Sequence, residues 1–223
     1  MDTISKQKNT AAFFDLDLTL TNTDSFRLFL KTYYFSRFSR MIFIPHVFVA
    51  GVLRKLRLIS LKKFKESALI GLKGKSIEDI RQLGGLFFEK HLKKTLREKA
   101  FERLKEHSIN GDTVYIVSAS PDIYVHAACR YLNCDGYICT TLDYCSTIFS
   151  GRIRGNDCIG REKKTRIMKL AKKLSLNLKT SWAYSDHEVD IPFFETVGNK
   201  VAVTPTLELL QIAGSRNWGI EEW

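Results

Sequence analysis

Five short, almost continuously apolar runs, separated by stretches with a helical pattern, constrain the fold of this 223-residue chain more than any other feature. The runs are AAFFDL (11–16), TVYIVS (113–118), GYICTT (136–141), SWAYS (181–185) and KVAV (200–203). Strands that are covered on both faces have such continuous apolar sequences, whereas half-exposed strands alternate. Because strands alternating with helices are joined by right-handed crossovers, the pattern predicts an α/β fold with a parallel sheet between two helical layers.

Three of the helices can be predicted from their boundary residues as well as from their periodicity. The first contains PDIYVHAACRYL, with Ser120 as N-cap and Pro121 at the first helical position. The second, REKKTRIMKLAKKL, follows Gly160. The third, TPTLELLQIAG, is expected to start at Thr204 and to stop at Gly214.

One long segment interrupts the alternation. Residues 22–110 contain amphipathic patterns such as SFRLFLKTYYFSRF and TLREKAFERLKEH, and no convincing strand. The simplest arrangement joins residues 1–21 and 111–223 into one core and inserts 22–110 after the first strand as an all-helical cap. A shorter irregularity, TLDYCSTIFSGRIRG, predicts a β-hairpin that turns around Ser150–Gly151.

The formal charge of +11 is concentrated in the predicted cap. Residues 22–110 hold 20 of the 35 Lys and Arg residues and 8 of the 24 Asp and Glu residues, a net charge of +12. A basic region attracts anionic partners such as phosphorylated metabolites or anionic lipid headgroups. The alternative is a set of solvated helix faces. Nucleic acid is disfavoured as a partner, and the sequence does not indicate an oligomeric state.

The cysteines and the first residues favour a cytoplasmic protein. Five cysteines form neither a CxxC pair nor a cluster with histidines, so reduced and mostly buried thiols are expected. The polar start, MDTISKQKNT, does not resemble a secretory signal.

The longest apolar stretch is MIFIPHVFVAGVL, residues 41–53. It is shorter than the roughly 20 residues that a membrane-spanning helix needs. We expect a buried helix of the cap. The alternative is a helix that lies on a membrane surface, which would place the protein peripherally at the inner face of the membrane.

Polar side chains that suit phosphate chemistry stand at or beside the predicted carboxyl ends of the strands. In an open parallel sheet, ligands bind at this edge. Any one of these residues alone would be interpreted as a turn or capping residue, but together they predict a site. They are Asp15, Asp17, Ser118, Lys163, Asp186 and Asp190.

The motifs FFDLDLT, VYIVSASPD, CIGREKKTRI and AYSDHEVDIPFF, in this order, resemble the haloacid dehalogenase superfamily of phosphohydrolases. The sequence is most similar to subfamily IB, the phosphoserine-phosphatase-like group, and it also resembles the phosphatidylglycerophosphate phosphatases of the family. The resemblance covers residues 11 to about 205. It implies a Rossmann-like three-layer core with a parallel sheet and a helical cap of the C1 type.

The resemblance also implies how the first motif acts. Asp15 would be the nucleophile that forms an aspartyl-phosphate, and Asp17 would be the general acid and base. Magnesium prefers hard oxygen ligands, and the metal set would be Asp15, Asp17 through its backbone carbonyl, and Asp186.

The later motifs would bind the phosphoryl group. Ser118 and Ala119 would bind its oxygens, and Lys163 would neutralise its charge, with Lys164 as the competing candidate. Asp190 would hold a metal-bound water or orient Lys163.

The sequence departs from the family pattern at three positions, with Leu18 and Ser185 where glycine is common and Val189 where a polar residue is common. These changes leave the carboxylates in place and alter their surroundings.

The expected function is therefore a magnesium-dependent phosphomonoester hydrolase. Its substrate would be a small phosphorylated metabolite, such as phosphoserine, or a lipid headgroup phosphate. The alternative is a non-enzymatic basic module on a degenerate phosphatase fold, which would bind an anionic membrane or nucleic acid.

Overall fold

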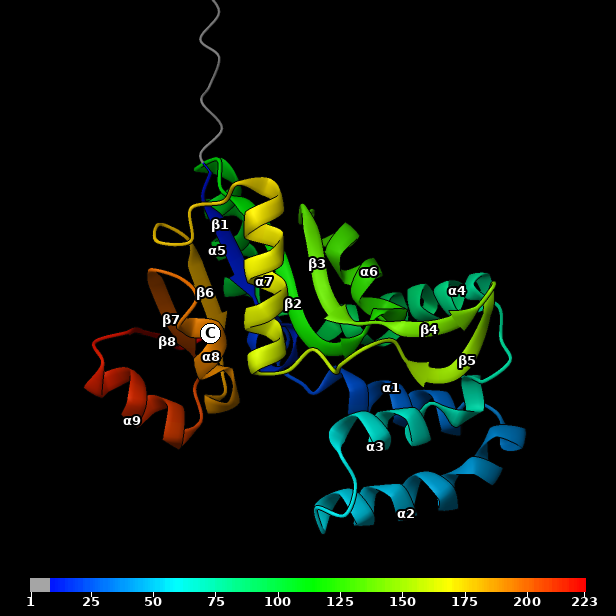
Figure 1. Cartoon of the computed structure of the whole chain (residues 1–223). Coiled ribbons are helices and arrows are strands. Elements are labelled where there is room, and N and C mark those ends of the chain that lie inside the picture. The colour runs from blue at the N-terminus through cyan, green and yellow to red at the C-terminus, as the bar shows by residue number, and fades with distance from the viewer. Residues whose placement is uncertain (1–8) are drawn as a thin grey trace, which may run out of the picture.

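The computed structural model describes residues 9–223, so the first eight residues of the predicted non-secretory start lie outside the description. Six parallel strands form one sheet in the order β3-β2-β1-β6-β7-β8, and β4 and β5 form an antiparallel pair (Figure 1). The strands are β1 (Ala11–Phe14), β2 (Thr113–Pro121), β3 (Gly136–Thr140), β4 (Leu142–Cys145), β5 (Ile148–Ile153), β6 (Trp182–Ser185), β7 (Asn199–Val203) and β8 (Gly219–Glu221).

The helices come between these strands and in one long insert after β1. The α-helices are α1 (Ser25–Phe35), α2 (Ile44–Lys55), α3 (Leu61–Ala68), α4 (Ile77–Phe87), α5 (Glu98–Ile109), α6 (Asp122–Tyr131), α7 (Arg161–Leu174), α8 (Ile191–Phe194) and α9 (Leu207–Ser215). Shorter helical turns are η1 (Leu16–Leu20), η2 (Phe38–Phe43), η3 (Ile70–Leu72), η4 (Phe88–Leu92), η5 (Lys93–Thr95) and η6 (Glu188–Asp190).

The structure confirms the predicted α/β class and the parallel sheet. Each of the five predicted apolar runs contains a strand of the sheet. The edge strand β8 was not predicted, because its three residues lack the apolar run that marks a strand covered on both faces.

Two hydrophobic clusters cover the two faces of the sheet. Alternate side chains of β1 enter different clusters, with Ala12 and Phe14 in one and Ala11 and Phe13 in the other. The first cluster includes residues of α5 and α6, and the second includes residues of α7, α8 and α9. This arrangement explains why the strands have continuous apolar sequences.

The insert after β1 is helical and packs on the first cluster. Phe29 of α1 and Phe87 of α4 contact each other edge to face, and both contact Tyr124 of α6. Helix α5 contributes Leu104 to the same cluster. The division into core segments 1–21 and 111–223 and a cap at 22–110 stays a prediction.

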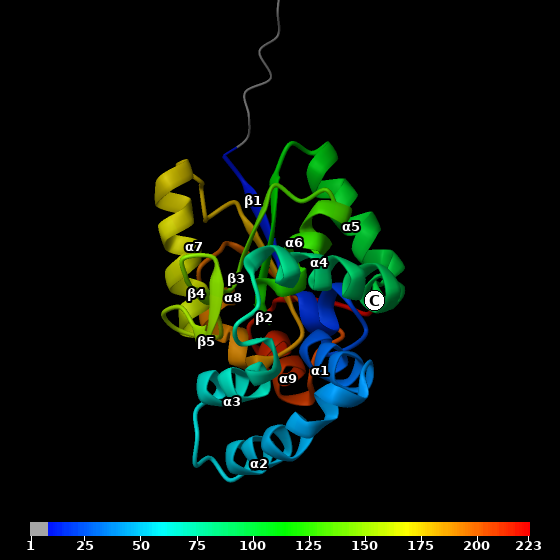
Figure 2. The ribbon, with the colours of Figure 1, turned by 90° about the vertical axis from the view of Figure 1, so that its right-hand side faces the viewer.

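The β4–β5 hairpin lies beside the insert (Figures 1 and 2). The backbone NH of Gly74 donates to the carbonyl of Phe149 at 3.0 Å, and the NH of Ile77 donates to the carbonyl of Thr147 at 2.8 Å. The hairpin was predicted, but the predicted turn at Ser150–Gly151 was wrong. The chain turns at Ser146–Thr147, where Ser146 takes a left-handed φ of 55°.

Two predicted helix starts were also wrong. Pro121 is the N-cap of α6, whereas the hydroxyl of Ser120 bonds to other side chains. Helix α9 starts three residues later than predicted, because Thr206 caps it by accepting from the NH of Leu209 at 3.2 Å.

The apolar stretch at 41–53 forms η2 and α2, and the expectation that it is buried was wrong. Ala50 is the buried residue of α2, while Phe48, Val49 and Val52 are exposed. The description of residues 9–223 includes no helix that is long and apolar enough to cross a membrane. Among residues 9–223 none of the five cysteines is paired in a disulfide, and three of them are buried, whereas the predicted redox state stays a prediction.

Candidate active site

The predicted site residues of the first and last motifs meet because β1 and β6 are neighbours. The NH of Asp15 donates to the carbonyl of Tyr184 at 2.9 Å, so Asp15 leaves the sheet beside Ser185. The hydroxyl of Ser185 lies 3.5 Å from Oδ2 of Asp15. The carboxyl ends of the two strands therefore bring Asp15 next to the segment that carries Asp186.

A tight turn after β1 separates the two carboxylates of the first motif. The turn contains Asp17 in an extended conformation and Leu18 with a left-handed φ of 56°. Glycine adopts this φ without steric cost, whereas other residues lose roughly 1 kcal/mol. Leu18 therefore costs the turn some stability that a glycine would not cost.

Asp17 points toward the first turn of α1 and the end of β2. Its carboxylate accepts from the NH of Ser25 at 2.6 Å and from the hydroxyl of Ser120 at 2.7 Å. The hydroxyl of Ser118 is 3.4 Å away. Burial raises the pKa of Asp17, and the hydrogen bonds from Ser25 and Ser120 oppose that rise.

The structure distinguishes the two candidate lysines. Lys163 is 1% exposed, and its ammonium lies 3.0 Å from Oδ1 of Asp15 and 2.7 Å from Oδ2 of Asp190. Burial lowers the pKa of Lys163, but the carboxylates of Asp15 and Asp190 outweigh this effect and raise it overall. Lys164 is half-buried on the next position of α7. Lys163 is thus the lysine that contacts the first motif.

Asp186 and Asp190 complete the group of acids. The hydroxyl of Thr19 donates to Oδ1 of Asp186 at 3.4 Å, and that of Ser185 donates to Oδ2 of Asp190 at 2.7 Å. Burial raises the pKa of Asp186 to about 6. Burial also raises the pKa of Asp15, which the charge of Lys163 counteracts and the neighbouring acids increase.

These acids fit a divalent cation. Four buried or nearly buried carboxylates are accompanied by the single ammonium of Lys163, so the group has an excess of negative charge. Oδ1 of Asp190 is buried without a hydrogen-bond partner. Within residues 9–223 no three His, Cys, Asp or Glu side chains gather as a metal site. The Asp17 carboxylate is turned toward Ser25. The donor set that the resemblance implies, the Asp15 and Asp186 carboxylates with a backbone carbonyl, has the oxygen chemistry that Mg²⁺ prefers.

Ala119, which was predicted to bind phosphate, contacts a lysine of the insert. This residue, Lys65, was not predicted from the sequence. Lys65 of α3 is buried, and its ammonium donates to the carbonyl of Ala119 at 2.5 Å and to Oδ1 of Asp157 at 2.7 Å. The hydroxyl of Thr140 also donates to Oδ1 of Asp157, at 2.5 Å. In the sequence, Lys65 is one of many lysines on an amphipathic pattern. The available signal was its helical spacing, which places Lys65 on the same face of α3 as the buried Ala68.

Ser25 and Ser120, which hold the Asp17 carboxylate, were not predicted as site residues. The hydroxyls of Ser25 and Ser120 are 2.9 Å apart, and both lie 3.1 Å from the hydroxyl of Tyr124. Ser25 is 95 residues away from Ser120, and no local sequence pattern links the two.

The chain matches the family model for haloacid dehalogenase-like hydrolases over residues 12–195. Phosphoserine phosphatase SerB1 of Mycobacterium tuberculosis is 28% identical over 217 residues, which cover 96% of this chain and 70% of that protein. Protein CicA of Caulobacter vibrioides is 30% identical over 184 residues, which cover 79% of this chain and 78% of that protein.

Solved structures agree on the fold. A crystal structure of a protein of unknown function from Bordetella pertussis has a TM-score of 0.85 and 23% identity, over 96% of this chain and 98% of that one. A phospho-aspartyl intermediate analogue of phosphoserine phosphatase has a TM-score of 0.63 and 22% identity, over 96% and 93%. With its four motifs in order along the chain, this protein belongs to the haloacid dehalogenase-like hydrolases, in the phosphoserine-phosphatase-like group.

Proposed function

We propose that the protein is a magnesium-dependent phosphomonoester hydrolase that acts through an aspartyl-phosphate on Asp15. The observation that carries this proposal is the Asp15 carboxylate, which is buried beside Lys163 and close to Asp186 at the carboxyl edge of the sheet. An anionic nucleophile reaches a phosphate dianion only where positive charge offsets their repulsion.

The first step transfers the phosphoryl group to the enzyme. An Asp15 carboxylate oxygen attacks phosphorus, and the bond from phosphorus to the leaving oxygen breaks. Asp17 donates a proton to that oxygen, which requires a carboxyl that is protonated part of the time. The raised pKa of Asp17 supports this role, because burial disfavours its charged form.

The second step releases phosphate. The Asp17 carboxylate accepts a proton from a water molecule whose oxygen attacks phosphorus, and the bond between phosphorus and Asp15 breaks. Phosphate leaves, and both aspartates return to their starting states. The hydrogen bonds from Ser25 and Ser120 support this role, because they fix the Asp17 carboxylate in one orientation.

Three groups would bind the phosphoryl oxygens through both steps. Ser118 and the backbone at Ala119 would donate hydrogen bonds, and Lys163 would supply a positive charge. Asp15, Asp186 and the Asp17 backbone carbonyl would hold Mg²⁺, which would offset negative charge on the transferring group when bound. Asp190 would orient Lys163, and its 2.7 Å contact supports this role.

Two substrate classes fit this proposal. The relative named phosphoserine phosphatase favours a small phosphorylated metabolite. The basic insert favours an anionic lipid headgroup phosphate, with the protein in the cytoplasm and in peripheral contact with a membrane. A substrate panel that includes both classes, with the lipids presented in vesicles, distinguishes them by kcat/KM.

The test of the reaction is hydrolysis of an aryl phosphate with Mg²⁺ or with EDTA. We expect Mg²⁺-dependent turnover that Asp15→Asn reduces by about 10³-fold or more, because the variant lacks the attacking oxygen. Acid-quenched wild-type protein should carry phosphate from a labelled substrate, and the variant should carry none. Asp143→Asn, on the partly exposed hairpin, is the matched control and should retain full turnover.

A non-enzymatic module would behave differently. It would show no Mg²⁺-dependent turnover on any phosphate ester, and Asp15→Asn would leave its binding to anionic partners unchanged. That pair of results would reject the hydrolase.

A further inference from the structure

Helix α2 has two apolar faces, and one of them has no partner among the described residues. Ile44 and Val47 pack against the main hydrophobic cluster, and Ala50 is buried. A side chain at Gly51 would meet the ring of Phe64 on α3. These positions repeat every three to four residues and define the inward face.

The opposite face is apolar and exposed. Phe48 is 70% exposed, and Val49, Val52 and Leu56 are exposed beside it at helical spacing. Just before α2, Phe38 of η2 is 90% exposed and Ile42 is also exposed. We call these six residues the outer apolar face. Monomeric proteins rarely expose so many large apolar side chains within one short segment.

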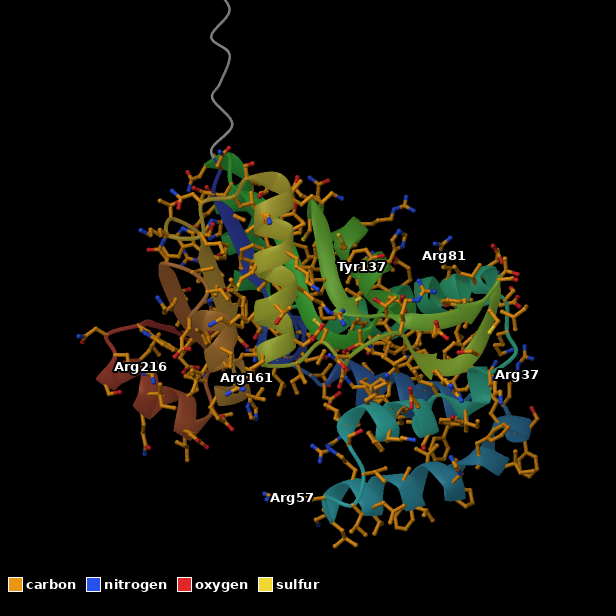
Figure 3. The ribbon with its side chains drawn as sticks, in the orientation of Figure 1. Arg37, Arg57, Arg81, Tyr137, Arg161 and Arg216 are labelled. Atoms are coloured by element: carbon orange, nitrogen blue, oxygen red, sulfur yellow. The ribbon has the colours of Figure 1, made fainter. Side chains whose placement is uncertain are left out.

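The surrounding charge is entirely positive. Residues 25–65 contain ten Lys and Arg residues and no Asp or Glu. Arg54 and Lys55 lie in the last turn of α2, and Arg57 follows it. Figure 3 shows Arg37 and Arg57 near the two ends of the η2–α2 segment. The outer apolar face is thus bordered by cations at both ends.

We infer that the outer apolar face docks on an anionic membrane surface, with α2 lying in the plane of the headgroups. An in-plane helix needs an apolar face that enters the headgroup boundary and basic residues that reach the phosphates, and α2 has both. A second copy of this chain fits poorly, because its own cationic segment would repel the first. A nucleic acid would contact the cations but not the apolar side chains.

The position of α2 relative to the site agrees with docking of this kind. The strands of the main sheet run toward the end of the molecule at which α2 lies, and their carboxyl ends face it (Figures 1 and 2). Docking through α2 would therefore bring the candidate site to the membrane side of the protein. The inference names the surface for the peripheral membrane contact considered above, and it does not depend on the hydrolase reaction.

The test is cosedimentation of the full chain with vesicles of phosphatidylglycerol and phosphatidylcholine, compared with phosphatidylcholine alone. We expect binding to the anionic vesicles that weakens as salt is added. Phe38→Ser combined with Phe48→Ser should reduce the partition coefficient by about tenfold or more, since each phenyl ring loses its burial in lipid. Leu207→Ser is the control, because Leu207 is 80% exposed on α9, outside the outer apolar face.

A second pair of variants tests the charge. Lys55→Gln with Arg57→Gln should weaken anionic binding by about thirtyfold, at about 1 kcal/mol for each of the two cations. Lys172→Gln with Lys173→Gln removes two exposed cations at the far end of α7 and should change binding little. Thermal melting checks that all variants fold.

Several results would overturn the inference. Equal recovery in the supernatant with both vesicle types at low salt would do so. So would equal losses in test and control variants, or a dimer in solution that Phe38→Ser with Phe48→Ser dissociates. Hydrolysis of a water-soluble aryl phosphate should stay unchanged in all four variants, so failure of docking can be told apart from failure of the proposed function.

Discussion

Gly160 has a backbone conformation that only glycine adopts readily, with φ of 51° and ψ of −114° at the start of α7. A Cβ atom there would lie 3.0 Å from the carbonyl oxygen of Val189. Three residues later, α7 supplies Lys163, whose ammonium contacts both Asp15 and Asp190. The position of the Lys163 ammonium therefore depends on the backbone conformation of Gly160, which the side chains of this motif do not determine.

We expect Gly160→Ala to destabilise the fold by about 1–3 kcal/mol and to lower kcat about tenfold or more, because a shift of α7 moves Lys163. Gly155→Ala is the matched control, since Gly155 also has a positive φ but has open space around it. Thermal melts and steady-state kinetics measure both effects. An unchanged kcat in Gly160→Ala would show that the start of α7 does not position the lysine.

The side chains that we propose to act chemically could be located from the sequence, but the groups that hold them could not. Asp15, Asp17 and Asp186 each directly follow or closely follow an apolar strand, so the strand pattern alone locates them at one edge. Ser25 and Ser120 reach Asp17 from distant parts of the chain. Such contacts depend on how the insert packs, and short-range patterns do not contain that information.

At the scale of elements, α3 is tied to the core by one buried ion pair. Lys65 and Asp157 are both nearly inaccessible, and the second carboxylate oxygen of Asp157 is buried without a partner. Since Lys65 also donates to the carbonyl of Ala119, the pair joins the insert to the predicted phosphate-binding turn.

Lys65→Met should destabilise the protein by about 3–5 kcal/mol, because it leaves the Asp157 charge buried without a cation. Lys62→Met is the control on the same helix, where an exposed ammonium donates to the carbonyl of Gly155, and it should cost less than about 1 kcal/mol. Chemical denaturation measures both. Adding Asp157→Asn to Lys65→Met should recover part of the loss, and additive effects of the two changes would contradict the pairing.

The elements of the insert were harder to predict than those of the sheet. Helical periodicity indicated that 41–53 is a helix, but an apolar run does not reveal whether its faces are covered. The structure leaves Phe48 and its neighbours exposed, because α3 covers one side of α2 only.

For the molecule as a whole, the alternation of strands and helices was sufficient to predict the fold class, since parallel strands covered on both faces allow few arrangements. The same topology has a consequence for stability. It brings Asp15, Asp17, Asp186 and Asp190 to one edge, and burial raises the pKa of Asp186 to about 6. The folded chain therefore gathers acidic groups at this edge, and Lys163 contacts two of them, Asp15 and Asp190.

A divalent cation at this edge should stabilise the whole fold, because a ligand that binds only the native state adds RT ln(1 + [L]/Kd). We expect Mg²⁺ to raise Tm above the value in EDTA, with NaCl of equal ionic strength giving a smaller change. Asp186→Asn should lose most of the Mg²⁺ effect, since it replaces one of the two carboxylates that we propose as ligands. An equal Mg²⁺ response in Asp186→Asn and the wild type would exclude Asp186 as a ligand.

In EDTA, where no divalent cation is bound, Asp186→Asn should stabilise the fold relative to the wild type. The folded pKa of Asp186 lies above its ordinary value of 3.8, so the stability that this group contributes is present below that value and is lost as the pH rises through about 6. Asp186→Asn removes the buried charge and should therefore raise Tm at about pH 7.5. The corresponding gain in the free energy of unfolding should be on the order of 1–3 kcal/mol. At about pH 5 the gain should be smaller, because Asp186 is already mostly protonated in the folded chain. If Asp186→Asn stabilised the metal-free protein equally at both pH values, the charge of Asp186 would not be the cause of the stabilisation.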